Sequence, residues 1–220
     1  MVARGVQPGQ FLHLLAPRTQ GLLLPVVPVS GFDRVAGTIT TLVASRPGSV
    51  AGLVALREGE AARFDGPLGR GFVIDPRSRY LLVIADVQSF GRVRAVVDEA
   101  VASGRQVTVL LGARSVAEVY PSSLLPDEAE YVVATVDGSL GHRGEVTELV
   151  TEYEAWADQC FAAGSSSLVA RLAALAKGRD ARMGVARLGR RRGRRPEPGG
   201  ADARRKAWLQ VALSHAAGCA

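Results

Sequence analysis

Cysteine is scarce in this sequence, and so are aromatic residues and long hydrophobic runs. Two cysteines in 220 residues, Cys160 and Cys219, cannot form a disulfide framework, and they favour a reducing, cytoplasmic location. No apolar run approaches the roughly 20 residues that cross a bilayer, and residues 1–8 hold no apolar signal-peptide core, so we expect neither a membrane span nor a secretory leader. The histidines, His13, His142 and His215, show no metal-ligand spacing.

The positive charge of the chain is confined to one segment. The whole chain carries a net charge of +6, but residues 177–206 hold 12 Lys/Arg and 3 Asp/Glu, a net +9, so the remainder is mildly acidic. Nucleic-acid or acidic-membrane binding by this segment is one interpretation, and a solvated linker is the other. No aromatic side chains interleave the arginines of 187–195 to form a stacking platform. We therefore favour the linker and expect no nucleic-acid partner.

Two patterns of hydrophobicity divide the chain. Residues 10–74 contain short strand-like runs separated by Gly and Pro, which is typical of a small antiparallel barrel. From residue 79 onward, apolar runs at 80–85, 106–112, 130–135 and 159–164 alternate with helical patterns at 93–102, 116–124, 146–156 and 168–176. This alternation predicts an open, mostly parallel sheet with helices on both faces. The fold class is thus a β-barrel followed by an α/β domain.

The same patterns set the expected domain boundaries. We assign residues 1–76 to the barrel and 77–178 to the α/β domain. Residues 179–206 lack an apolar period and are rich in Arg, Gly and Pro, so we expect a disordered linker there. Apolar character returns at 207–217, and residues 207–220 form a separate C-terminal segment.

Two glycine-rich segments follow strand-like runs about 70 residues apart. The first reads GPLGRGF at 66–72 and the second TVDGSLGHRG at 135–144. Glycine permits a positive φ and a close approach of the backbone to a ligand, so such turns commonly hold phosphates or flat cofactors. Asp137, Gly138 and Ser139 are turn formers by themselves, and for them a structural turn is favoured over direct ligand contact.

These two segments, with PGQF at 8–11 and AAGS at 162–165, carry a resemblance to a known family. They resemble the PGQF, GPLGxGF, TxDGSxGxxG and CGP-type segments of the electron-transfer subunit of class B dihydroorotate dehydrogenase, within the ferredoxin–NADP reductase-like superfamily. The resemblance covers roughly residues 8–176. It implies that electrons from dihydroorotate oxidation in a partner catalytic subunit pass through a [2Fe–2S] cluster and FAD towards NAD, in pyrimidine biosynthesis.

The resemblance also implies where the cofactors would lie. FAD is expected between the barrel and the α/β domain, and the cluster in a Cys-rich C-terminal module for which 207–220 would be the start or a remnant. Cys219 would be the first cluster ligand, but four are needed, so this chain holds a cluster only if it continues past Ala220. The implied FAD-binding residues are Gly48, Ser49, Gly66, Pro67, Leu68, Gly69, Gly71 and Phe72.

Three departures from the family pattern weaken these expectations. Residues 24–30 read LPVVPVS where the family has an RPFS-like flavin motif, so the arginine that would pair with the pyrophosphate is missing. Residues 85–92 read ADVQSFGR where a GGGxGxAP turn is usual, and Asp86 would repel a pyrophosphate, which makes NAD binding doubtful. In the CGP-like loop, Ala163 and Ser165 replace cysteine and proline.

Two functions from different classes remain open at this point. The first is an electron-transfer flavoprotein subunit that works with a dihydroorotate dehydrogenase-type catalytic subunit and retains a weakened FAD site. The second is a cofactor-poor homologue that acts as a regulatory or scaffolding partner. Retention of FAD separates the two.

Overall fold

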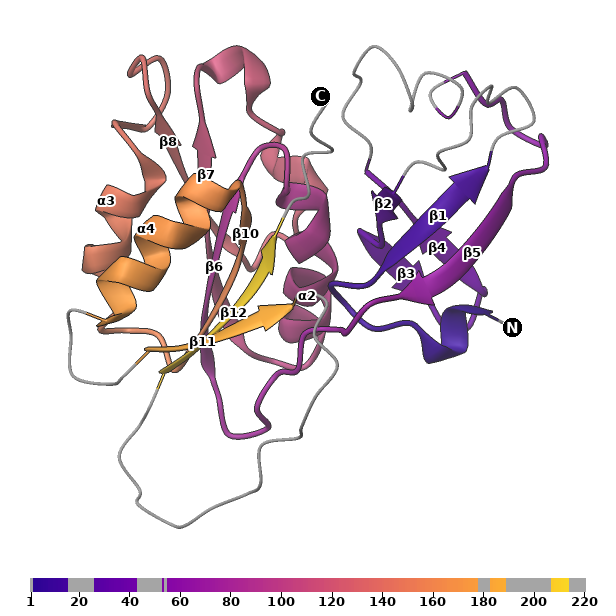
Figure 1. Ribbon diagram of the computed structural model, residues 1–220, viewed down its shortest axis with the longest axis horizontal. Coiled ribbons are helices and arrows are strands. Elements are labelled where there is room, and N and C mark those ends of the chain that lie inside the picture. Colours follow the sequence, from indigo (N-terminus) through magenta and orange to yellow (C-terminus); the bar gives the residue numbers. More distant parts are fainter. Residues whose placement is uncertain are drawn as a thin grey trace.

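The computed structural model describes residues 2–15, 26–42, 53, 55–177, 183–188 and 207–213. The predicted Gly48, Ser49 and Cys219 lie outside these residues. Within them the chain forms an antiparallel β domain followed by an α/β domain built on a parallel sheet, as the sequence predicted (Figure 1). None of the helices in the described part is long and apolar enough to cross a membrane.

The N-terminal domain is built from short antiparallel strands. Strand β1 (Phe11–Leu15) lies between β2 (Val26–Pro28) and β5 (Arg63–Leu68), and β3 (Gly31–Asp33) pairs with β4 (Thr38–Thr40) in a hairpin. A short 3₁₀ helix, η1 (Val2–Gly5), precedes β1. Alternate apolar residues of these strands meet in a small core made of Val6, Leu12, Val27, Val29 and Leu53.

The second domain is a parallel sheet whose strand order is β11-β12-β10-β6-β7-β8-β9 in the described residues. Its strands are β6 (Tyr80–Asp86), β7 (Gln106–Ala113), β8 (Glu130–Thr135), β9 (His142–Arg143), β10 (Gln159–Gly164), β11 (Met183–Leu188) and β12 (Ala207–Leu213). Strands β6, β7 and β10 are almost wholly buried, which explains their continuous apolar sequences.

Helices cover both faces of the sheet. Helix α2 (Phe90–Ala102) packs on the face that is turned towards the β domain, whereas α3 (Val146–Tyr153) and α4 (Ser166–Lys177) cover the other face (Figure 1). Two short 3₁₀ helices, η2 (Val116–Glu118) and η3 (Ser122–Leu124), connect β7 to β8. Phe90, Val93 and Phe161 belong to the core under α2, and Leu149 and Leu172 to the core on the opposite face.

Most of the expected elements of the α/β domain are found at their predicted positions, but the C-terminal part differs. Residues 183–188 lie in the expected linker and form β11, which pairs with β12. Residues 207–213 lie in the expected cluster segment and form β12, which pairs in parallel with β10 along its whole length. Both segments therefore extend the sheet, because each backbone completes the hydrogen bonding of an otherwise open strand edge. The expected helix over 116–124 is two separate 3₁₀ turns.

Candidate functional site

The junction segment, residues 66–72, leaves the β domain and enters the α/β domain. Its backbone is held by the β domain: the Phe72 amide donates to the Pro8 carbonyl over 2.7 Å, and the Gln10 side-chain amide donates to the Gly69 carbonyl over 3.2 Å. Gly69 has a φ of +83°, and a Cβ at this position would lie only 2.8 Å from the Phe11 ring. A larger residue at Gly69 would need both a strained backbone and a displaced ring, which explains this glycine.

The last residue of the junction segment anchors the two domains to each other. The Phe72 side chain is buried in the core under α2, where its ring meets Phe161 edge to face with 5.2 Å between centroids. Phe161 is on β10, in the centre of the parallel sheet. Phe72 therefore has a packing role in this structure, while Gly69 and Arg70 of the same segment are exposed.

The β domain and α2 are in direct contact near the start of that helix. A Cβ at Gly91 would lie only 2.9 Å from Ser30 Oγ and 3.3 Å from Leu42 Cβ, so glycine allows the helix to approach the β domain closely. Ser30 ends the run that replaces the RPFS-like motif, and it is fully buried. Its hydroxyl oxygen accepts the Leu42 amide over 2.9 Å. The Ser30 hydroxyl is thus enclosed by residues of this chain and is not open to a ligand.

The turn after β6 is closed by an acidic side chain. Asp86 Oδ1 accepts the Ser89 amide over 2.9 Å, and Asp86 Oδ2 accepts the Ser165 amide over 2.7 Å. Ser165 follows β10, the neighbour of β6 in the sheet. From the sequence we expected Asp86 to lie where a pyrophosphate would bind. The structure adds that its carboxylate joins the carboxyl ends of two adjacent strands.

The second glycine-rich segment folds into a turn that its own side chains stabilise. Asp137 accepts from both the amide and the hydroxyl of Ser139, over 2.9 and 2.6 Å, and these hydrogen bonds lower the pKa of Asp137. The Ser139 hydroxyl in turn accepts the Val116 amide over 2.8 Å and so positions η2. Thr135 bonds both the amide and the carbonyl of Leu140. These contacts support the structural-turn interpretation of this segment.

Gly141 is the position in this turn with the strictest requirement for glycine. Its φ is +67°, and a Cβ there would overlap the Val133 carbonyl oxygen of β8. Because the obstacle is backbone, we expect Gly141→Ala to lower the free energy of unfolding by about 2 kcal/mol. Urea denaturation would measure this loss. Gly104→Ala is the matched control, since its φ of +75° is similar but its Cβ would meet nothing within 4 Å. Equal losses in the two variants would contradict the steric explanation.

An apolar hollow of about 480 Å³ lies beside this turn. It is lined by residues of η2, η3, the segment between them, β8 and the turn itself, among them Val119, Tyr120, Tyr131 and Leu140. The Tyr131 hydroxyl donates to the Tyr120 carbonyl over 2.9 Å, and burial raises the pKa of Tyr131 to about 12. Tyr131 is therefore an uncharged part of the wall of this hollow at physiological pH.

Cys160 is buried in β10, and burial raises the pKa of its thiol to about 12. It is therefore an inert packing residue. In the described residues no three His, Cys, Asp or Glu side chains gather closely enough to hold a metal ion. His142 instead pairs with Glu148 over 2.9 Å at the start of α3.

Sequence reasoning located the junction segment and the Asp86 turn, but it missed their connections. The distant partners of these segments are Pro8, Gln10, Phe161 and Ser165. The periodicity of a single segment gives no signal for such contacts. Sequence reasoning also gave no role to Arg70, an exposed cation in the junction segment.

Comparison with known proteins supports the resemblance. No protein-family model matches the chain. The electron transfer subunit of dihydroorotate dehydrogenase B (NAD(+)) from Listeria monocytogenes is 28% identical over 167 residues, which cover 75% of this chain and 66% of that protein. The same subunit from Desulforamulus reducens is 32% identical over 157 residues, covering 70% and 60%. The matches thus span 60–66% of these relatives.

Solved structures share the fold at lower sequence identity. The NADH-dependent reduced ferredoxin–NADP oxidoreductase aligns with a TM-score of 0.66 and 20% identity, covering 81% of this chain and 64% of that one. The ferredoxin reductase of carbazole 1,9a-dioxygenase aligns with a TM-score of 0.66 and 19% identity, covering 79% and 56%. The chain is therefore a homologue of the electron-transfer subunits of dihydroorotate dehydrogenase B, and it has a ferredoxin-reductase-like fold.

Proposed function

We propose that this protein is an electron-transfer flavoprotein subunit that works with a dihydroorotate dehydrogenase-type catalytic subunit. The observation that carries the proposal is the junction segment, which matches the relatives' motif and lies at the boundary of the two domains. FAD supplies the redox chemistry in such proteins, and the polypeptide binds, orients and tunes it. A [2Fe–2S] cluster would need ligands beyond those of this sequence, because Cys160 is buried and only Cys219 remains.

The exposed part of the junction segment is suited to a flavin phosphate. Gly69 and Arg70 are both exposed, so this part of the segment presents backbone and a cationic side chain to the surface. A guanidinium pairs with a phosphate through two parallel hydrogen bonds. We propose that Arg70 takes the place of the arginine missing from 24–30, together with the backbone of Gly66, Pro67, Leu68, Gly69 and Gly71 and the Gly48-Ser49 pair.

The buried Ser30 hydroxyl favours a second candidate function. Ser30 and Gly91 are in contact where the β domain meets α2, so Ser30 offers no free hydroxyl to a flavin ring. A homologue in which protein atoms occupy the place of the flavin would keep the fold and the partner subunit but would bind no flavin. It would then act as a regulatory or scaffolding subunit of the same complex.

Flavin retention by the full chain distinguishes the two functions. We expect the purified protein, incubated with FAD and freed of excess, to show a flavin absorbance band near one equivalent. We expect Arg70→Gln to weaken FAD binding about tenfold, because one charge-assisted phosphate contact is lost. Arg63→Gln in β5 is the matched control, since Arg63 is also exposed but lies outside the junction segment. A folded protein that retains no flavin would support the scaffolding function instead.

A further inference from the structure

The carboxyl ends of β6 and β10 form the place where an open α/β sheet binds its ligand. From β6 the chain proceeds to β7 and β8 on one side, and it then returns to β10 and β12 on the other side of β6. The strand order therefore reverses between β6 and β10, and ligands of such sheets bind in the crevice at that reversal. Helix α2 starts directly after β6, so its N-terminal amides point to the same crevice, as they do at phosphate sites.

In this chain two amides at the crevice already have an anionic partner. Asp86 is the last residue of β6, and its carboxylate accepts the Ser89 amide, 2.9 Å away, at the start of α2. The other carboxylate oxygen accepts the Ser165 amide, 2.7 Å away, just after β10. A carboxylate that bonds to amides from both sides of the crevice takes the donors that a phosphate would need, and its charge repels a second anion.

We propose that Asp86 is a built-in anion that occupies the phosphate position of the α/β domain and excludes pyridine dinucleotides. The inference goes beyond the proposed function, because it concerns the NAD of the relatives' name and not the flavin. The residues present do not fit a bound NAD, so this chain must exchange electrons with some other acceptor if it carries FAD.

Two further groups show that the position is built for an anion. Ser89 directly precedes α2, a helix of 13 residues, and a serine at this position commonly accepts a hydrogen bond from a helix amide. Its hydroxyl oxygen is instead buried without a hydrogen-bond partner. Arg92, in the first turn of α2, is half-buried; burial lowers the pKa of its guanidinium, and the charge of Asp86 opposes that shift. Asp86 is thus the negative charge that favours the charged form of Arg92. Without the Asp86 carboxylate, the Ser165 amide would lose its acceptor, whereas the Ser89 amide would keep its 3.0 Å bond to the Asp86 backbone carbonyl, and the crevice would lose its negative charge.

The proposal predicts that removal of one carboxylate creates a nucleotide site. The probes are NADH and inorganic pyrophosphate, titrated separately into the full-length protein while the backbone amide resonances of Ser89 and Ser165 are followed by NMR. In the wild-type protein we expect neither resonance to move at millimolar probe. In Asp86→Ala we expect both to move and both probes to bind at least tenfold more tightly than to the wild type.

A matched variant and a conservative one make the test decisive. Asp127→Ala removes one negative charge from an exposed position just before β8, near the amino end of that strand. The crevice lies at the carboxyl ends of β6 and β10, so this variant should bind both probes no better than the wild type. If Asp86→Ala does not fold, Asp86→Asn serves in its place. It removes the negative charge and one acceptor oxygen, so we expect both probes to bind at least tenfold more tightly than to the wild type.

Two results would overturn the proposal. They are movement of the two resonances in the wild-type protein, and a folded Asp86→Ala, or Asp86→Asn in its place, that binds neither probe better than the wild type. Flavin content is measured independently by absorbance, so a failure of this inference is distinguishable from a failure of the proposed function.

Discussion

Replacement of Arg94 by methionine is expected to lower the free energy of unfolding by about 3 kcal/mol. The Arg94 guanidinium, on α2, donates to the Leu124 carbonyl over 2.6 Å and to the Ser30 carbonyl over 3.0 Å. It also pairs with Asp98 one turn later, over 3.0 Å, and its side chain is only 21% exposed. Each hydrogen bond of a charged donor contributes about 1.5–3 kcal/mol, and methionine retains only the packing of the aliphatic stem.

The loss in Arg94→Met should depend on pH in a defined direction. Burial raises the pKa of Asp98, and the neighbouring Arg94 opposes this shift. Without Arg94 the pKa of Asp98 rises further above its value in the unfolded chain. An acid whose pKa is raised on folding favours the folded state at low pH and opposes it as the pH rises through the folded pKa. The deficit relative to the wild type should therefore be larger at pH 7 than at pH 4.

Urea denaturation of the wild type and variant at both pH values would measure this effect. Arg94→Lys is the conservative variant: it keeps the charge beside Asp98 but cannot reach both carbonyls with one ammonium group, so we expect about half of the loss. Because Ser30 belongs to the β domain and Leu124 to the β7–β8 connection, the wild-type contact joins three parts of the fold. A loss below 1 kcal/mol in Arg94→Met would mean that the Phe72 anchor and the packing at Gly91 hold the domains together without Arg94.

The sequence was most informative where structure is determined locally. Strands β8 and β10 coincide with the predicted apolar runs, and for β10 the reason is that a strand buried on both faces needs uninterrupted apolar residues. Strands β11 and β12 were missed for the opposite reason. Their place in the sheet depends on pairing with β10 and with each other, which no local period reveals, and the surrounding Arg, Gly and Pro residues suggested a linker.

The same distinction applies to the candidate site. The position of Asp86 after β6 follows from the local strand-to-helix pattern, and so does its bond to Ser89, three residues later. Its bond to Ser165 spans 79 positions and depends on the adjacency of β6 and β10. Ser30 is a similar case: its burial depends on Gly91, which sequence reasoning treated only as a remnant of a glycine-rich turn. Proximity across the sheet and between domains therefore required the structure.

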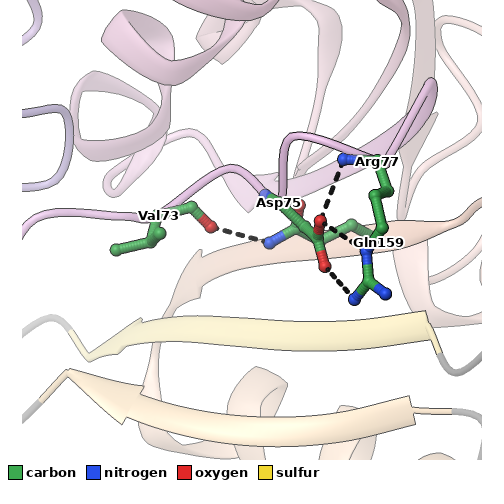
Figure 2. Close-up of polar contacts among 4 residues, drawn as sticks. All are labelled: Val73, Asp75, Arg77 and Gln159. Carbon is green, nitrogen blue, oxygen red and sulfur yellow. Dashed lines mark hydrogen bonds and ion pairs between the residues drawn. The ribbon is translucent and has the colours of Figure 1, made fainter. Parts of the chain in front are cut away.

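Gln159→Leu is the second substitution for which we expect a large effect, again about 3 kcal/mol of unfolding free energy. Gln159 begins β10 and is only 2% exposed. Its side-chain amide donates to the Val73 carbonyl over 2.8 Å and accepts the Asp75 amide over 3.0 Å, as Figure 2 shows. Leucine has a similar size but no polar atoms, so both of these bonds would be lost and two backbone groups would be left without them. Val73 is 65% exposed, so the loss falls mainly on the half-buried Asp75 amide, where a missing partner costs about 1–3 kcal/mol.

The consequence of this loss should be concentrated in the segment that connects the two domains. Val73 and Asp75 are the first and third residues after Phe72. Gln159 therefore fixes the chain segment that follows the residue anchored in the α/β core. Besides lower stability, we expect at least tenfold faster hydrogen exchange at the Asp75 amide in Gln159→Leu. Gln106→Leu is the matched control, because Gln106 also begins a central strand but is exposed.

The neighbouring Asp75–Arg77 pair separates the effect of the amide from that of surface charge. Arg77 donates to the Asp75 carboxylate over 3.1 Å, and these contacts lower the pKa of Asp75, but the Arg77 side chain is 88% exposed (Figure 2). An ion pair so accessible to water contributes little, and Arg77→Gln should leave stability nearly unchanged. If Arg77→Gln were as damaging as Gln159→Leu, the ion pair and not the buried amide would hold the connection. If only Gln159→Leu is damaging, one neutral side chain 84 positions from Asp75 fixes the path between the domains.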